Sequence, residues 1–98
     1  DWVVSEQNRI YNGVLIYYPA GNQYNGHSYH SLQGAVAFFE NRHIYVYYAF
    51  QSSLNEQGEQ TSLKYYVRID PDYLDFAVSH GWIKYVNPNQ RYFKTKNN

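Results

Sequence analysis

The chain of 98 residues contains no cysteine and no methionine. Without cysteine it has no disulfide framework, no thiolate zinc site and no thiol chemistry. Its net charge is zero and charged residues make up only 16%, so it lacks both the broad basic field of a nucleic-acid binder and the polybasic segment of a membrane-surface protein. No run approaches the roughly 18 apolar residues that span a membrane. The sequence therefore predicts no nucleic-acid partner, no membrane span and no cofactor.

Aromatic residues are abundant instead. They make up 20% of the chain, and 13 of them are tyrosines. Tyrosine suits β-strands, and it also suits surfaces that bind through a ring with a polar tip. The length is enough for one domain that folds alone, and we find no linker, internal repeat or low-complexity segment. We therefore expect a single domain that spans residues 1–98.

The most apolar stretch is residues 34–50, which read GAVAFFENRHIYVYYAF. Two apolar arms flank a polar break at residues 40–43, and this pattern predicts the central hairpin of an antiparallel sheet. A helix is the alternative for residues 31–39, because apolar residues at positions 32, 35, 36 and 39 follow helical spacing. Gly34 lies inside the run, and the second arm is rich in β-branched and aromatic residues, so we prefer the strand interpretation.

Further strands and one helix complete the predicted fold. The additional strands are expected at residues 2–4, 10–18, 63–69, 82–86 and 91–94. Residues 51–62 are polar and predict an exposed connection. The sum is an α+β fold: a curved, mainly antiparallel sheet of about six strands, with one helix at about residues 71–80 packed on one face.

The predicted helix has clear start and stop signals. Asp70 is expected to be the N-cap, Pro71 takes the first helical position, and Gly81 is placed to end the helix. Its buried stripe is predicted to be formed by Leu74, Ala77 and Val78.

Residues 21–31 form a polar loop that follows the turn chemistry of residues 19–22. The Asn25-Gly26 pair within it favours a tight turn. Loops of this kind carry function more often than cores do. Exposed tyrosines of the sheet would add an aromatic surface beside the loop. The predicted binding residues are Tyr24, His27, Tyr29, His30, Tyr45 and Tyr47.

Motifs for chemistry are absent. His27 and His30 are three residues apart and have the spacing to share an ion, but a zinc site needs three or four ligands and no other ligand pattern supports one. No serine lies in a nucleophile elbow. Three of the eight carboxylates crowd the start of the predicted helix, where capping and the helix dipole explain them. The sequence therefore predicts neither catalytic residues nor a metal site, and it favours a protein that is not an enzyme.

Asparagine and glutamine are plentiful, whereas lysine and glutamate are sparse. In this balance the chain resembles small secreted or surface-associated domains of unknown function from Gram-positive bacteria of the lactic acid type. The resemblance implies an extracellular or cell-surface location, with a signal segment removed. The expected function is a non-enzymatic binding module for a glycan, a cell-wall polymer or a protein partner. Two alternatives stay open: a small enzyme or enzyme-inhibitory domain that acts through the 21–31 loop, and a structural domain that associates with its own copy.

Overall fold

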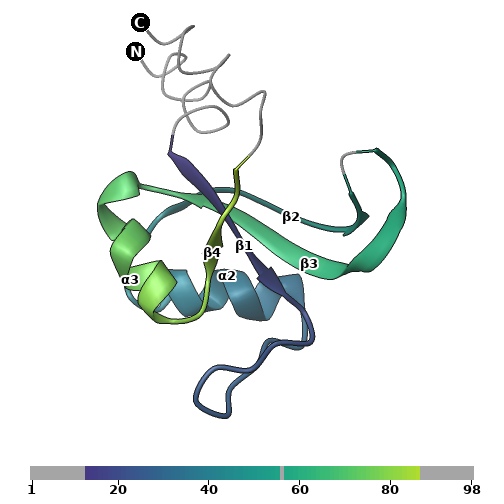
Figure 1. Cartoon of the computed structure of the whole chain (residues 1–98). Coiled ribbons are helices and arrows are strands. Elements are labelled where there is room, and N and C mark those ends of the chain that lie inside the picture. Colours follow the sequence, from purple (N-terminus) through teal and green to yellow (C-terminus); the bar gives the residue numbers. More distant parts are fainter. Residues whose placement is uncertain (1–12, 56, 87–98) are drawn as a thin grey trace, which may run out of the picture.

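The computed structural model describes residues 13–55 and 57–86. The elements in chain order are β1 (Val14–Pro19), α2 (Leu32–Glu40), β2 (Val46–Leu54), β3 (Gln60–Ile69), the 3-10 turn η1 (Pro71–Tyr73), α3 (Leu74–Ser79) and β4 (Ile83–Lys84). The four strands form one antiparallel sheet in the order β2-β3-β1-β4. Both helices lie on the same face of this sheet (Figure 1). The β-α-β-β-α-β connectivity with interleaved strands is that of the ferredoxin-like arrangement.

The predicted α+β class with an antiparallel sheet is confirmed, but the number of strands is not. The described residues contain four strands instead of about six. Residues 2–4 and 91–94, where two further strands were predicted, lie outside the described residues. Of the predicted strand at residues 82–86, Ile83–Lys84 forms the strand β4, and the Tyr85 N–H donates to the Leu15 carbonyl of β1 at 2.9 Å.

The two central strands, β1 and β3, place alternate side chains on the two faces of the sheet. β1 and β3 pair over their full common length, with Ile16 opposite Val67. Because side chains alternate along a strand, one face of this pair is buried beneath the helices. The residues of that face are Val14, Ile16, Tyr18, Tyr65, Val67 and Ile69.

The predicted central hairpin is wrong in its first arm, which is the helix α2. Ser31 is the N-cap, and its Oγ accepts a hydrogen bond from the Gly34 backbone N–H at 3.1 Å. The helix buries Ala35 and Phe39, which are both 0% exposed, against the sheet. The helical spacing of the apolar residues therefore prevails over the strand preference of single residues, because it places the apolar residues on one face of a helix that packs against the sheet. Gly34 is tolerated because it lies on the exposed side.

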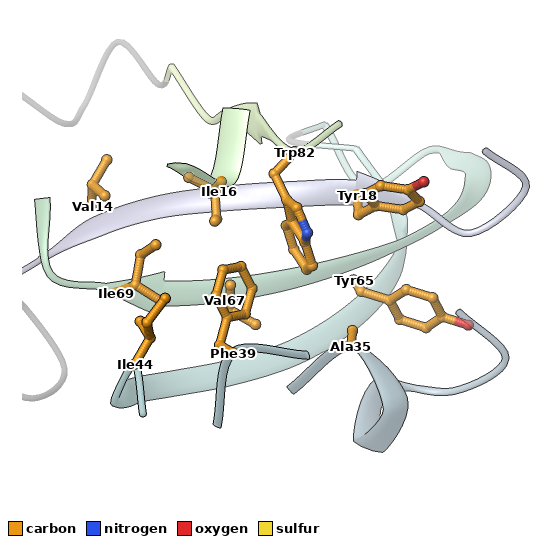
Figure 2. Close-up of a cluster of buried hydrophobic side chains, with 11 residues drawn as sticks. Val14, Ile16, Tyr18, Ala35, Phe39, Ile44, Tyr65, Val67, Ile69 and Trp82 are labelled. Atoms are coloured by element: carbon orange, nitrogen blue, oxygen red, sulfur yellow. The ribbon is translucent and has the colours of Figure 1, made fainter. Parts of the chain in front are cut away.

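The polar break after α2 is a helix end and not a hairpin turn. His43 has a positive φ of 62°. The Ile44 N–H donates to the Phe39 carbonyl at 3.0 Å, and the His43 N–H donates to the Glu40 carbonyl at 3.0 Å. These two bonds define a Schellman motif, in which the residue that follows the positive-φ position packs back against the helix. Ile44, at 5% exposed, packs there beside Phe39 (Figure 2).

The described residues between 51 and 62 are mostly exposed, as predicted, but the prediction that this whole stretch is a connection is wrong. β2 extends to Leu54 and β3 begins at Gln60, so the connection shrinks to a tight hairpin loop. Asn55 organises it: its Oδ1 accepts from the backbone N–H groups of Gln57 and Glu59 at 2.9 and 2.8 Å. The polar sequence did not indicate strands here, because this end of the hairpin is exposed to solvent on both faces. Such strands need no alternation of apolar and polar residues.

The second helical segment confirms the predicted start and end. The Asp70 carboxylate accepts from the Asp72 N–H at 2.9 Å. Gly81 has a φ of 95°, and the Trp82 N–H donates to the Ala77 carbonyl at 3.1 Å. These contacts place Trp82 under the sheet directly after the helix.

The predicted buried stripe of that helix needs one correction. Ala77 is 0% exposed, as expected, and Leu74 packs against the core, but Val78 is 49% exposed. The segment opens with a 3-10 turn, which rotates faster per residue than an α-helix and so shifts the buried face. Phe76 packs against the core in place of Val78.

The core lies between the sheet and the two helices. Trp82, which is 2% exposed, joins the layers because its ring lies 5.0 Å from the Phe39 ring and 5.3 Å from the Tyr18 ring. Figure 2 shows Trp82 between β1 and the side chains that rise from α2. No helix of the described residues is long and apolar enough to cross a membrane.

Candidate functional site

The 21–31 loop is held by a tight turn, as predicted. Tyr24 and His27 exchange two backbone hydrogen bonds of 2.8 and 2.9 Å. Asn25 and Gly26 between them both have positive φ, 52° and 79°, which is typical of the two-residue hairpin turns that favour this dipeptide.

Tyr29 belongs to the core and not to an open surface. Its ring lies 4.8 Å from that of Tyr18, and the Trp82 indole Nε1–H donates to its hydroxyl at 3.3 Å. Burial raises the pKa of Tyr29, although the Trp82 hydrogen bond acts in the opposite direction. Tyr29 therefore anchors the loop to the fold.

The histidines of the loop are exposed and form no cluster. Among the described residues, the imidazole that makes hydrogen bonds is that of His80, with the Phe76 carbonyl at 2.8 Å and the Ser79 hydroxyl at 3.1 Å. The described part of the chain holds no group of three or more His, Cys, Asp or Glu side chains suited to a metal ion. Among the described residues, neither His27 nor His30 makes a side-chain hydrogen bond.

Tyr45 and Tyr47 lie at the other end of the sheet. Their rings form an edge-to-face pair 5.2 Å apart. A Cβ built on Gly13 would lie 3.1 Å from the Tyr47 ring, which places Tyr47 beside the start of β1, whereas the 21–31 loop follows the end of β1. The structure therefore does not bring the six predicted binding residues into one site.

The face of the sheet opposite the helices carries an aromatic cluster that the sequence did not predict as a unit. It comprises Tyr17, Tyr48, Phe50, Tyr66 and Tyr85. The Phe50 and Tyr66 rings are stacked 4.6 Å apart at an angle of 4°. That separation matches the spacing of neighbouring strands, about 4.8 Å, so these rings stand upright and point their edges away from the sheet. Their stacked faces are used within the cluster.

The strand β2 forms an edge of the sheet. Among the described residues, no strand pairs with its outer side. Its sequence, VYYAFQSSL, contains no charged residue and no proline. Charged residues and proline are the common means by which edge strands block further pairing, so β2 lacks both. Register irregularities between Val46 and Tyr48 and between Ser52 and Leu54 interrupt the ladder near both ends. Residues 48–52 therefore form a regular, uncharged stretch with an open side.

A groove of about 460 Å³ runs between this edge strand and α2. It is lined by Leu32, Gln33, Val36, Glu40 and Gln51. Leu32 and Val36 are half-buried and supply its apolar wall, whereas the two amides and the carboxylate are exposed. Gln51 pairs with Tyr65, whose side chain is in the core, so Gln51 points to the helix side of β2 and into the groove.

Among the described residues that line this groove, Glu40 is the one that carries a charge. Within the described ranges, no cationic side chain forms an ion pair with it. The nearby Arg42 is engaged elsewhere, since its guanidinium lies 4.2 Å from the centre of the Phe38 ring and donates to the Phe38 carbonyl at 2.8 Å. Glu40 is also the last residue of α2, and the cation at this helix end is Arg42, which bonds to the Phe38 carbonyl of the last turn.

We define the strand-and-groove site as residues 48–52 together with the five groove residues. The sequence did not predict this site, because the pattern favoured a strand for residues 34–39 and a connection for residues 51–62. The signal was present in the absence of charge and proline from residues 46–54, but an edge cannot be recognised before the strand order is known.

Comparison with known proteins adds no assignment: no protein-family model matches the chain, and neither characterised proteins nor solved structures gave a match. The connectivity of the fold alone assigns no function. A function for this chain is therefore inferred from the geometry of its surface.

Proposed function

We propose that this chain is a non-enzymatic binding module that holds an extended segment of a protein partner at the strand-and-groove site. The observation that carries the proposal is the open, uncharged edge at residues 48–52 beside an apolar-walled groove. In strand addition, main-chain hydrogen bonds to an edge supply affinity, and pockets for alternate side chains supply specificity. An edge and a groove side by side provide both parts.

The dimensions fit a short segment. Strands rise about 3.3 Å per residue, so residues 48–52 offer about 17 Å of ladder, enough for a peptide of about five residues. On the groove side, alternate peptide side chains would meet Leu32 and Val36. On the opposite side they would meet Phe50, which is half-buried.

The extracellular placement is part of the same proposal, as a module of a bacterial surface or secreted protein. It is supported by composition: the chain has no thiol to protect and is rich in polar amides. A protein partner is favoured over a glycan or wall polymer, because the stacked rings of the aromatic cluster leave few faces for sugar rings.

The test is a titration of the full chain with a fluorescent peptide of alternating valine and threonine, followed by hydrogen exchange. We expect saturable binding and slower exchange of amides within residues 48–52. A peptide N-methylated at alternate positions should not bind, because it lacks the donors that pair with an edge. Binding of wall polysaccharide but not of peptide would replace the protein partner with a glycan.

A matched pair of variants separates the groove from the rest of the surface. Val36→Lys places a charge on the groove wall, whereas Val78→Lys makes the same change on α3 at a position that is 49% exposed. We expect the first variant to lose peptide binding and the second to retain it. Equal affinities of folded Val36→Lys and Val78→Lys would contradict the role of the groove.

A further inference from the structure

We infer that the partner segment is basic as well as apolar: it carries a lysine or arginine that lies over Glu40, with apolar residues at alternate positions along the groove. This inference rests on the proposed function and names the chemistry of the ligand at the same site. It follows from the charge of the groove and the pattern of its walls.

Glu40 supplies the charge of the groove. Its carboxylate has no ion-pair partner among the described residues, and the other polar groups of the groove are the neutral amides of Gln33 and Gln51. A cation placed there gains from the carboxylate, whereas the C-terminal end of the α2 dipole is already met by the Arg42 guanidinium at the Phe38 carbonyl. An acidic side chain would be repelled by the carboxylate. The site therefore selects the sign of the ligand's charge.

The apolar argument depends on the spacing of side chains in a strand. A segment paired with residues 48–52 sends every second side chain toward α2. Leu32 and Val36 lie one turn apart on that helix and offer two half-buried aliphatic contacts. The segment therefore needs apolar residues two apart on the groove face, with the basic residue on the same face.

A second copy of this chain fits less well. Antiparallel pairing of β2 with the β2 of a copy would satisfy the backbone, but β2 contains no basic residue. Such a dimer would leave both Glu40 carboxylates without a cation. Charge complementarity therefore favours a partner of different sequence.

The experiment compares three fluorescent hexapeptides that alternate valine and threonine and carry one lysine, glutamine or glutamate on the valine face. Fluorescence anisotropy with the full chain at low ionic strength measures each affinity. We expect the lysine peptide to bind about five-fold more tightly than the glutamate peptide, as for one exposed ion pair of roughly 1 kcal/mol. Added salt should reduce this ratio, because the pair is exposed to solvent.

The variant Glu40→Gln should bring the ratio close to one while the glutamine peptide binds as before. The control Asp75→Asn, which removes an exposed carboxylate from α3, should leave the ratio unchanged. Binding of all three peptides with equal affinity would overturn the inference but leave the proposed function intact. If no peptide binds, the proposed function itself fails. Dimers in light scattering with protected amides at residues 48–52 would identify a second copy as the occupant and would overturn the inference.

Discussion

Replacing Phe39 with alanine, and separately Phe38 with alanine, tests how α2 packs on the sheet. Phe39 is 0% exposed and lies 5.0 Å from the Trp82 ring, whereas Phe38 is half-buried, with Arg42 on one face of its ring. A fully buried phenylalanine replaced with alanine typically costs about 3–5 kcal/mol, including the cavity that remains. For Phe38 we expect about 1–2 kcal/mol, from partial burial and the lost cation–π contact.

The assay is urea unfolding followed by tryptophan fluorescence, with circular dichroism as a second probe. A domain of this size has a total stability on the order of 5–15 kcal/mol, so Phe39→Ala should remove a large share of it. At about 4–8 °C per kcal/mol, its melting temperature should fall by at least about 12 °C. The melting temperature of Phe38→Ala should fall by roughly half as much or less. If Phe38→Ala proved the more destabilising of the two, the orientation of α2 on the sheet would be wrong.

Three further predictions concern the turns, the helix cap and the response to pH. Gly81→Ala should destabilise by about 1–3 kcal/mol, because φ is 95° and the new Cβ would lie 3.2 Å from the Tyr18 ring; Gly21→Ala, which meets nothing within 4 Å, is the control and should stay within about 0.5 kcal/mol in thermal unfolding. Ser31→Ala should lower the free energy of unfolding in urea by about 1 kcal/mol, because it removes the N-cap of α2. Ser31→Asp should retain most of this stability, because aspartate also caps helices. Equal losses in both variants would refute the capping role. Burial raises the pKa of Tyr18 above 10.0. The stability this contributes is fully present below about pH 10 and is lost as pH rises through the folded pKa, since the unfolded chain releases the proton first. The free energy of unfolding should therefore be flat between about pH 7 and 9 and decline above pH 10, less steeply in Tyr18→Phe; identical slopes would refute the assignment to Tyr18.

The parts of the fold that the sequence predicted correctly are those with strong local signals. β3 alternates apolar and polar residues, and residues 70–81 carry a cap, a first-turn proline and a terminal glycine. The sequence also placed the tight turn at Asn25 and Gly26. In each case the chemistry that decides the conformation lies within a few residues.

The failures occurred where the deciding contact is distant in the sequence. Residues 32–40 have both strand-forming residues and helical spacing, and the choice depends on burial of Phe39 against β3 and Trp82. The polar residues of the β2–β3 hairpin gain their strand conformation from pairing with each other across the Asn55 loop.

The candidate site could not be predicted from the sequence for the same reason. It depends on which strand lies at the edge and on which helix flanks it, and both follow from the whole topology. The tyrosines chosen from the sequence instead fall at opposite ends of the sheet, and one of them, Tyr29, is part of the core packing. Local composition therefore identified aromatic residues without their arrangement.

The most direct test of the account is amide hydrogen exchange along β2 in the free chain at low concentration, resolved by residue with nuclear magnetic resonance. An open edge predicts alternation within residues 48–52: amides that bond to β3 exchange slowly, and those that point outward exchange quickly. Addition of the lysine peptide should then protect the outward amides. Slow exchange of every amide in residues 48–52 before any peptide is added would show that the edge is already covered, and it would contradict the strand-addition site.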